Sequence, residues 1–199
     1  MLTMPRALPR QLTSPVVAVL ARLGVTPNML TVGQMAGGIA AAALIAGGEL
    51  LWGGVAMLAA ATLDAFDGAL ARTTGKATRF GAVFDSVIDR LFEGAVFGGI
   101  LYYYLQQGAV EESMLAFVAI VGSLSVSYVR ARAQAEGVEV LDGLFTRGVR
   151  LILLALGLVS GELRAVLWVL AVMTVFTALH RLFAVWQKLR EESTGEERP

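Results

Sequence analysis

The sequence contains no cysteine among its 199 residues, and charged residues make up only 16% of it. Without cysteine, neither a disulfide framework nor a thiolate metal site is possible. An average soluble domain has about 25% charged residues, so this chain has too few of them to cover a water-soluble surface. Its 16 basic and 16 acidic residues cancel, which excludes the strongly basic surface of a generic nucleic-acid-binding protein.

Hydrophobic residues make up 56% of the chain and form charge-free runs that predict membrane-spanning helices. Residues 29–48 form a run of 20, which is about the length that a helix needs to cross a bilayer. The shorter runs span a membrane only if their helices continue through charged residues; they are residues 50–63, 94–110, 113–129, 151–161 and 165–180. We therefore expect an all-α integral membrane protein with a bundle of six transmembrane helices.

The two ends of the chain are predicted to lie outside this bundle. Residues 1–27 lack the cleavage site of a signal peptide, and we expect within them an amphipathic helix at residues 16–23 that lies on the membrane surface. Ser14 would cap this helix and Pro15 would occupy its first position. Residues 28–188 would form the transmembrane domain, and residues 189–199 a charged cytoplasmic tail.

The lysines and arginines predict the orientation in the membrane. If both termini are cytoplasmic, Arg164 is the single basic residue in the loops on the opposite side. The other basic loop residues then lie on the cytoplasmic side. Cytoplasmic loops of membrane proteins carry an excess of Lys and Arg. We therefore expect a multi-pass protein of the cell membrane with both termini in the cytoplasm.

Four aspartates at two helical spacings indicate a metal site. Asp64 and Asp67 share a face of the second span, and Asp85 and Asp89 share a face of the third. A turn at about residues 73–80 joins these helices, so the two pairs can face each other. Carboxylates in a low dielectric cannot all ionise without compensating positive charge. Because a site with only oxygen ligands favours Mg²⁺ or Mn²⁺, we expect two such ions, which could polarise a diphosphate.

Residues 64–89 meet every fixed position of the pattern D-x2-D-G-x2-A-R-x8-G-x3-D-x3-D. This pattern resembles the signature of the CDP-alcohol phosphotransferase family. Members of that family are membrane homodimers, with six helices per protomer and a polar cavity open to the cytoplasm. They transfer a phosphatidyl or similar group from a CDP-lipid to an alcohol and release CMP. The resemblance implies a metal-dependent, homodimeric enzyme of phospholipid biosynthesis with its active site on the cytoplasmic side.

The resemblance also implies roles for individual residues. Asp64, Asp67 and Asp85 would bind the two metal ions, and Asp89 would contact the second ion. Asp89 would also be the catalytic general base that takes the proton of the acceptor hydroxyl. Other residues of the motif, with the segment that opens the first span, would bind the CDP-lipid; they are Pro27, Asn28, Met29, Leu30, Gly68, Arg72, Thr78 and Gly81.

A set of arginines at the cytoplasmic ends of the later spans predicts a phosphorylated acceptor, because Arg binds phosphate through two parallel N–H groups. The set consists of Arg130, Arg147, Arg150 and Arg181. Residues 127–133 and 180–186 are similar to the phosphatidylinositol-phosphate synthase branch of the family, which joins CDP-diacylglycerol to inositol phosphate. That branch often has Arg-Pro-Glu-Arg where this chain has Arg-Gly-Val-Arg at residues 147–150. The departure keeps glycerol 3-phosphate, the acceptor of phosphatidylglycerophosphate synthases, as an alternative.

A small ion or anion transporter is the main competing class of protein. A conduction path requires polar residues across the whole membrane. In this chain the polar residues cluster in the predicted cytoplasmic half, and the outer halves of the spans are apolar. The pattern therefore favours an enzyme whose partners are a CDP-lipid, a phosphorylated alcohol and the bilayer, with no nucleic acid.

Overall fold

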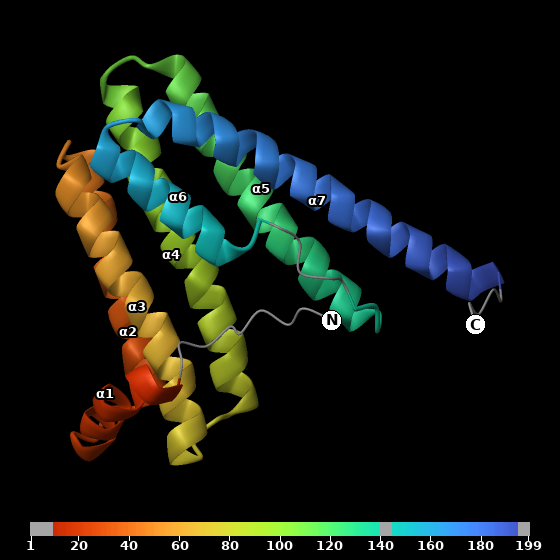
Figure 1. Ribbon diagram of the computed structural model, residues 1–199. Coiled ribbons are helices and arrows are strands. Elements are labelled where there is room, and N and C mark those ends of the chain that lie inside the picture. The colour runs from red at the N-terminus through yellow and green to blue at the C-terminus, as the bar shows by residue number, and fades with distance from the viewer. Residues whose placement is uncertain (1–9, 140–144, 195–199) are drawn as a thin grey trace. The chain divides into compact units, whose positions relative to one another are not determined.

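The structure is a computed structural model that describes residues 10–139 and 145–194. Within these residues all regular structure is α-helical, which confirms the predicted all-α class (Figure 1). The helices are α1 (Arg10–Arg22), α2 (Pro27–Ala46), α3 (Leu50–Thr74), α4 (Arg79–Gln106), α5 (Val110–Ala135), α6 (Arg147–Ser160) and α7 (Leu163–Thr194). The chain forms two compact units, Met1–Gly99 and Ile100–Pro199, and each is described below by itself.

Four of the described helices are long and apolar enough to cross a membrane: α2, α3, α5 and residues Leu163–Glu191 of α7. The helix α4 has 28 residues, but charged side chains occupy its first half. The 14 residues of α6 extend over only about 21 Å at 1.5 Å per residue. The bilayer core is about 30 Å thick, so α6 is short for a complete span. The helices support a multi-pass membrane protein, and the count of six spans stays a prediction.

The first helix starts earlier than the sequence pattern predicts. We expected Pro15 at its first position, but α1 begins at Arg10 and contains Pro15 in its interior. A proline at an interior position removes one hydrogen bond, and its ring crowds the carbonyl four residues earlier, yet α1 continues through this position. Val17 on α1 is buried in one cluster with Leu30 and Leu70, and α1 therefore packs on the end of the first unit where α2 begins.

Small residues bring α3 and α4 close to α2. A Cβ atom on Gly37 would lie 2.6 Å from the Cβ of Ala60 on α3, and one on Gly38 would collide with the Phe92 ring on α4. Glycine allows such close approach in membrane helices. The adjacent pair Gly37 and Gly38 therefore fixes the distance from α2 to both neighbouring helices.

The connection between α3 and α4 is short, as predicted. The helix α3 ends at Thr74, and Gly75 follows with a φ of 66°, a left-handed conformation that glycine adopts without strain. Thr78 then caps α4, because its Oγ1 accepts a hydrogen bond from the N–H of Gly81 at 2.9 Å. The second and third predicted spans are thus antiparallel neighbours.

In the second unit, α7 packs against both α5 and α6. Gly122 of α5 faces Thr174 of α7 so closely that a Cβ would not fit between them. Leu154 and Leu158 of α6 and Leu167 of α7 are buried with at most 2% exposure. Near the start of α7, Arg164 donates to both carboxylate oxygens of Glu111 at 2.8 and 2.9 Å.

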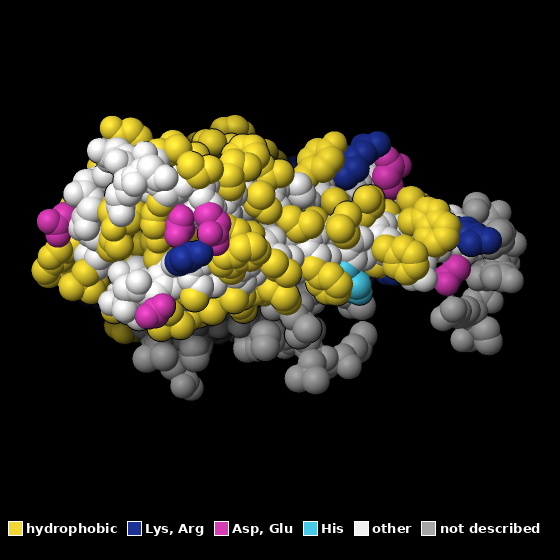
Figure 2. Space-filling model, turned by 90° about the horizontal axis from the view of Figure 1, so that it is seen from above, with side chains coloured by type: hydrophobic (Ala, Val, Ile, Leu, Met, Phe, Trp, Pro, Cys, Tyr) yellow, Lys and Arg dark blue, Asp and Glu magenta, His cyan; other side chains and the backbone are white. Residues whose placement is uncertain are grey.

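The surface carries many large hydrophobic side chains. Trp52, Phe117, Phe176 and Phe183 each expose half or more of their area. Figure 2 shows that hydrophobic side chains cover most of the face in view and that charged ones are few. An apolar surface of this extent is far larger than the patches of a soluble monomer and fits contact with lipid.

Candidate metal and substrate site

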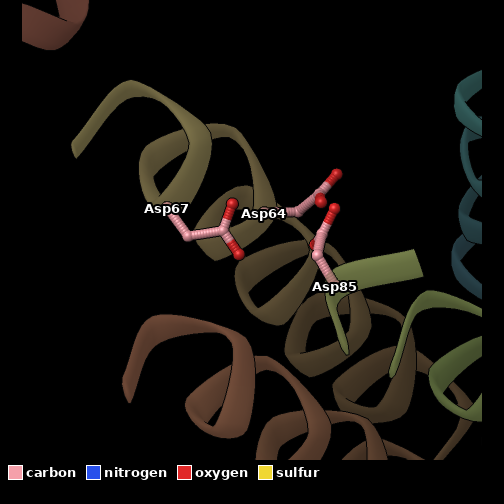
Figure 3. A group of neighbouring side chains, drawn as sticks. All are labelled: Asp64, Asp67 and Asp85. Carbon is pink, nitrogen blue, oxygen red and sulfur yellow. The ribbon is translucent and has the colours of Figure 1, made fainter. Parts of the chain in front are cut away.

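Three of the four predicted aspartates come together in the first unit. Carboxylate oxygens of Asp64, Asp67 and Asp85 lie within 4.8 Å of one another. Figure 3 shows that Asp64 and Asp67 extend from α3 toward Asp85 on α4. Asp67 is buried and the other two are half-buried. Three carboxylates this close repel one another unless positive charge lies among them.

This group of ligands fits the predicted metals. All three side chains offer oxygen, the ligand that Mg²⁺ and Mn²⁺ prefer. The spacing allows one ion to contact more than one of the carboxylates. Asp64, Asp67 and Asp85 are therefore the residues of the first unit that could hold a divalent cation.

Asp89 lies outside this group of three. It follows Asp85 by one turn of α4, and its Oδ1 accepts a hydrogen bond from Nε2 of Gln34 on α2 at 3.0 Å. Its carboxylate thus contacts α2, while Asp85 lies with the two aspartates of α3. This separation suits two different roles for the two aspartates of α4.

The sequence interpretation did not single out the α2 residues that hold these carboxylates. Oγ1 of Thr31 donates to Oδ2 of Asp67 at 2.7 Å, as Gln34 does to Asp89. A usable signal was present, because Asn28, Thr31 and Gln34 recur every three residues at the start of an otherwise apolar span. Such a spacing places polar side chains on one helical face.

Three of the predicted CDP-lipid residues meet where α2 and α4 begin. A Cβ on Gly81 would lie 2.9 Å from Oγ1 of Thr78 and 3.6 Å from Oδ1 of Asn28. Even alanine at position 81 would press on the Thr78 hydroxyl, whereas its Cβ would make an ordinary contact with Asn28. The two helix N-termini adjoin here, and their free N–H groups favour an anionic ligand such as a diphosphate.

The other predicted CDP-lipid residues have different surroundings. The Arg72 guanidinium folds back over Gly68, with its Nη1 atom 3.3 Å from where a Cβ would stand. The Met29 side chain is 59% exposed, whereas Leu30 is packed with Val17 and Leu70. Pro27 opens α2 behind the cap residue Thr26, so it shapes the turn at which Asn28 stands.

The predicted acceptor arginines all lie in the second unit. Arg181 of α7 is 5% exposed, and its Nη1 donates to the carbonyl oxygen of Val126 at 3.1 Å. Val126 precedes Arg130 by one turn of α5, so these two arginines belong to adjacent parts of neighbouring helices. Arg147 and Arg150 share the first turn of α6; Arg150 is 3% exposed, and its Nη1 lies 3.3 Å from the Phe145 carbonyl oxygen.

The fold and the site together define a membrane-associated helical protein with an oxygen-ligand metal site next to two helix N-termini. Residues 24–189 match the family model described as CDP-alcohol phosphatidyltransferase. Because this match covers most of the chain, the protein belongs to the CDP-alcohol phosphatidyltransferase family. The likeness stated from the aspartate motif is thereby confirmed.

Similar proteins within the family are known. The chain is 38% identical to the phosphatidylinositol phosphate synthase of Mycobacteroides abscessus over 184 aligned residues. The aligned region covers 88% of this chain and 84% of that protein. It is 33% identical over 175 residues to the archaetidylinositol phosphate synthase of Methanothermobacter thermautotrophicus, which covers 85% of this chain and 87% of that protein.

Crystal structures of the Mycobacterium tuberculosis phosphatidylinositol phosphate synthase have a similar fold. The structure with CDP-DAG bound has a TM-score of 0.83 and 33% identity, covering 88% of this chain and 94% of that one. The structure in complex with manganese and citrate has a TM-score of 0.80 and 33% identity, covering 87% of this chain and 88% of that one.

Proposed function

We propose that the protein is a metal-dependent transferase that moves a phosphatidyl group from CDP-diacylglycerol, or a related CDP-lipid, to an inositol phosphate and releases CMP. The cluster of Asp64, Asp67 and Asp85, with oxygens within 4.8 Å of one another, is the observation that carries this proposal. The inositol phosphate synthase relatives that match most of the chain support the choice of substrates.

Two divalent cations, Mg²⁺ or Mn²⁺, are the proposed cofactors. Asp64, Asp67 and Asp85 would hold them, with Asp89 contacting the second. Bound there, the cations would neutralise charge on the diphosphate and on the departing CMP. The manganese in the similar Mycobacterium tuberculosis structure supports this choice of metal.

The remaining residues of the first unit would bind the donor and move the proton. Asn28, Thr78 and Gly81 lie together where α2 and α4 begin, and the cytidine diphosphate would lie against them. Asp89 would accept the proton of the acceptor hydroxyl. The hydroxyl oxygen would then attack the β-phosphorus, which carries the lipid, and the bond from this phosphorus to the CMP oxygen would break. We favour direct attack, because the motif contains no Ser, Cys or His at a fixed position to form a covalent intermediate.

The arginines of the second unit would hold the acceptor's phosphate. Arg150 and Arg181 are almost completely buried, and a buried guanidinium forms strong hydrogen bonds to phosphate. Glycerol 3-phosphate is the second candidate acceptor, since residues 147–150 read Arg-Gly-Val-Arg instead of the Arg-Pro-Glu-Arg of the inositol branch. Both acceptors carry the phosphate that these arginines would recognise.

The arrangement in the membrane is part of the proposal. Together with the four candidate spans, α4 and α6 would complete a bundle of six helices, assembled as a homodimer. By the excess of Lys and Arg in cytoplasmic loops, both termini and the carboxylate site would lie on the cytoplasmic side, with α1 on the membrane surface. Residues 1–27, 28–188 and 189–199 would then be the surface segment, the catalytic domain and the tail.

The test is an assay of the purified protein with CDP-diacylglycerol and Mg²⁺ in lipid vesicles. Inositol phosphate, glycerol 3-phosphate and unphosphorylated inositol are supplied separately, CMP is measured and the lipid product is identified by mass spectrometry. We expect the fastest CMP release with inositol phosphate. Faster release with glycerol 3-phosphate would establish the alternative acceptor, and no CMP release with any acceptor would contradict the proposed function.

A further inference from the structure

Two buried polar side chains of α2 contact carboxylates on two other helices. Thr31 is 2% exposed and Gln34 is 0% exposed, and they stand three residues apart. Oγ1 of Thr31 donates to Asp67 on α3, and Nε2 of Gln34 donates to Asp89 on α4. One face of α2 therefore contacts both halves of the aspartate motif.

The Thr31 hydroxyl has a choice of acceptors, and the distances show which one it uses. Its oxygen lies 3.2 Å from the Pro27 carbonyl oxygen and 2.7 Å from Oδ2 of Asp67. A hydroxyl has one hydrogen to donate, and bonds to an ionised carboxylate are the shorter and stronger ones. The hydrogen therefore points to Asp67, which leaves Oδ1 of Asp67 for a cation.

A role in packing alone does not explain a glutamine at position 34. Its Oε1 atom is buried and accepts no hydrogen bond from the part of the chain that the structure describes. A buried carbonyl without a donor lowers stability, and leucine or methionine would fill the same space without that loss. The contact that the glutamine does make, to Asp89, explains the choice of residue.

The glycines one turn further along α2 make both contacts possible. Gly37 lets α3 approach at Ala60, and Gly38 lets α4 approach at Phe92. With about 3.6 residues per turn, Gly38 lies on the same face of α2 as Thr31 and Gln34, which precede it by seven and four residues. Hydrogen bonds at 2.7 and 3.0 Å need this close packing.

We propose that Thr31 and Gln34 are positioning residues: Thr31 orients the metal ligand Asp67, and Gln34 orients Asp89 toward the acceptor hydroxyl. This inference rests on the proposed function. Thr31 acts on metal affinity, because a hydrogen bond to a ligand fixes its direction. Gln34 acts on the rate of transfer, because a base must stand within hydrogen-bond reach of its proton.

The first test measures Mn²⁺ binding by electron paramagnetic resonance of free Mn²⁺ and needs no turnover. Loss of a hydrogen bond to a metal ligand typically weakens metal binding about 10- to 100-fold. We expect at least about a tenfold loss for Thr31→Val and less than threefold for Thr31→Ser, which keeps the hydroxyl. Thr174→Val is the matched control, because Thr174 is also buried but its hydroxyl donates to a backbone carbonyl of its own helix, that of Ala171.

The second test uses Gln34→Met, which keeps the volume and removes the amide. A shift of about 1 Å at a reacting group can cost about a hundredfold in rate. We expect the turnover number to fall about 10- to 100-fold, with the KM for CDP-diacylglycerol unchanged. In an Asp89→Asn background the same change should reduce the residual rate less than threefold, because Gln34 then has no base to orient.

These outcomes separate the inference from the proposed function. Wild-type Mn²⁺ affinity in Thr31→Val would overturn the role of Thr31. An equal loss of rate from Gln34→Met with and without Asp89 would show a purely structural effect and overturn the role of Gln34. If the wild type binds Mn²⁺ but releases no CMP with any acceptor, the proposed function fails, whereas the Mn²⁺ comparison still decides the role of Thr31.

Discussion

The two units of the chain place their functional residues in different ways. In the first unit, Asp64, Asp67 and Asp85 come from two consecutive helices joined by a four-residue link, and their carboxylates lie within 4.8 Å of one another. In the second unit, the arginines come from three helices, and the residues between Arg130 and Arg181 include a whole additional helix, α6. The carboxylate site is local in sequence, whereas the arginine set depends on the packing of distant segments.

The difference determines what each site needs from the rest of the fold. The carboxylates need α2 to approach α3 and α4, which Gly37 and Gly38 allow. Two of the arginines are held by backbone carbonyls, since Arg150 and Arg181 donate to Phe145 and Val126. A change in the first unit should therefore affect chemistry and donor binding, and a change in the second should affect the acceptor.

The largest effect is expected at Asp89. Replacement by Asn removes the group that accepts the proton, and loss of a general base typically costs about 10²- to 10⁴-fold in rate. CDP-lipid binding should largely survive, because Asp64, Asp67 and Asp85 stay in place. CMP release and binding of a fluorescent CDP-lipid are measured on the same preparation. CMP release near the wild-type rate would show that Asp89 is not the general base.

A smaller and more selective effect is expected at Arg181. A charge-assisted hydrogen bond is worth about 1.5–3 kcal/mol, so Arg181→Ala should raise the KM of the phosphorylated acceptor about 10- to 150-fold. The KM of the CDP-lipid should change little. Arg181→Lys should recover only part of the loss, because a point charge replaces a planar fork.

The control for Arg181 is Arg190→Ala. Arg190 lies on the exposed end of the same helix, with its Cζ atom 5.4 Å from the Trp186 ring centre. Its replacement by alanine should leave both KM values unchanged. If Arg181→Ala also keeps the wild-type acceptor KM, the second unit does not bind the phosphate, and the contrast between the units is wrong.

A change in helix spacing should affect stability in the first unit. Gly38→Ala places a methyl group against the Phe92 ring, and such overpacking typically costs about 1–3 kcal/mol. Gly98→Ala is the matched control, because a Cβ there meets nothing within 4 Å; it should be neutral or slightly stabilising. Unfolding temperatures in detergent compare the two variants, and equal temperatures would contradict the close packing at Gly38.

The smallest effect is expected at the exposed ion pair near the start of α7. Arg164 contacts Glu111, and both side chains are largely open to solvent. Exposed pairs contribute little to stability, but Arg164 also contacts Glu112, whose side chain is mostly buried. Arg164→Ala should therefore lower the unfolding temperature only slightly and leave CMP release unchanged. A clear loss of CMP release in this variant would show that this end of the second unit takes part in the reaction.

The sequence predicted the parts of this molecule that depend on nearby residues. The spacings indicated one helix face shared by Asp64 and Asp67 and another shared by Asp85 and Asp89, and the short link from α3 to α4 made the two helices neighbours. The structure brings Asp64, Asp67 and Asp85 together, whereas Asp89 contacts α2. The start of α1 was predicted wrongly, because the preference of proline for the first position of a helix does not exclude an interior proline, and Pro15 lies in the interior of α1. Thr31 and Gln34 were missed, since their partners lie 36 and 55 residues away and only packing brings them together.

The decisive measurement counts the Mn²⁺ ions that the purified protein binds in the presence of CDP-diacylglycerol. We expect two ions per chain in the wild type and fewer in Asp64→Asn, Asp67→Asn and Asp85→Asn. We also expect that removal of divalent cations by a chelator abolishes CMP release and that Mg²⁺ or Mn²⁺ restores it. Full CMP release after complete chelation, or equal Mn²⁺ binding in wild type and variants, would contradict the central claim that these carboxylates form the metal centre of the transferase.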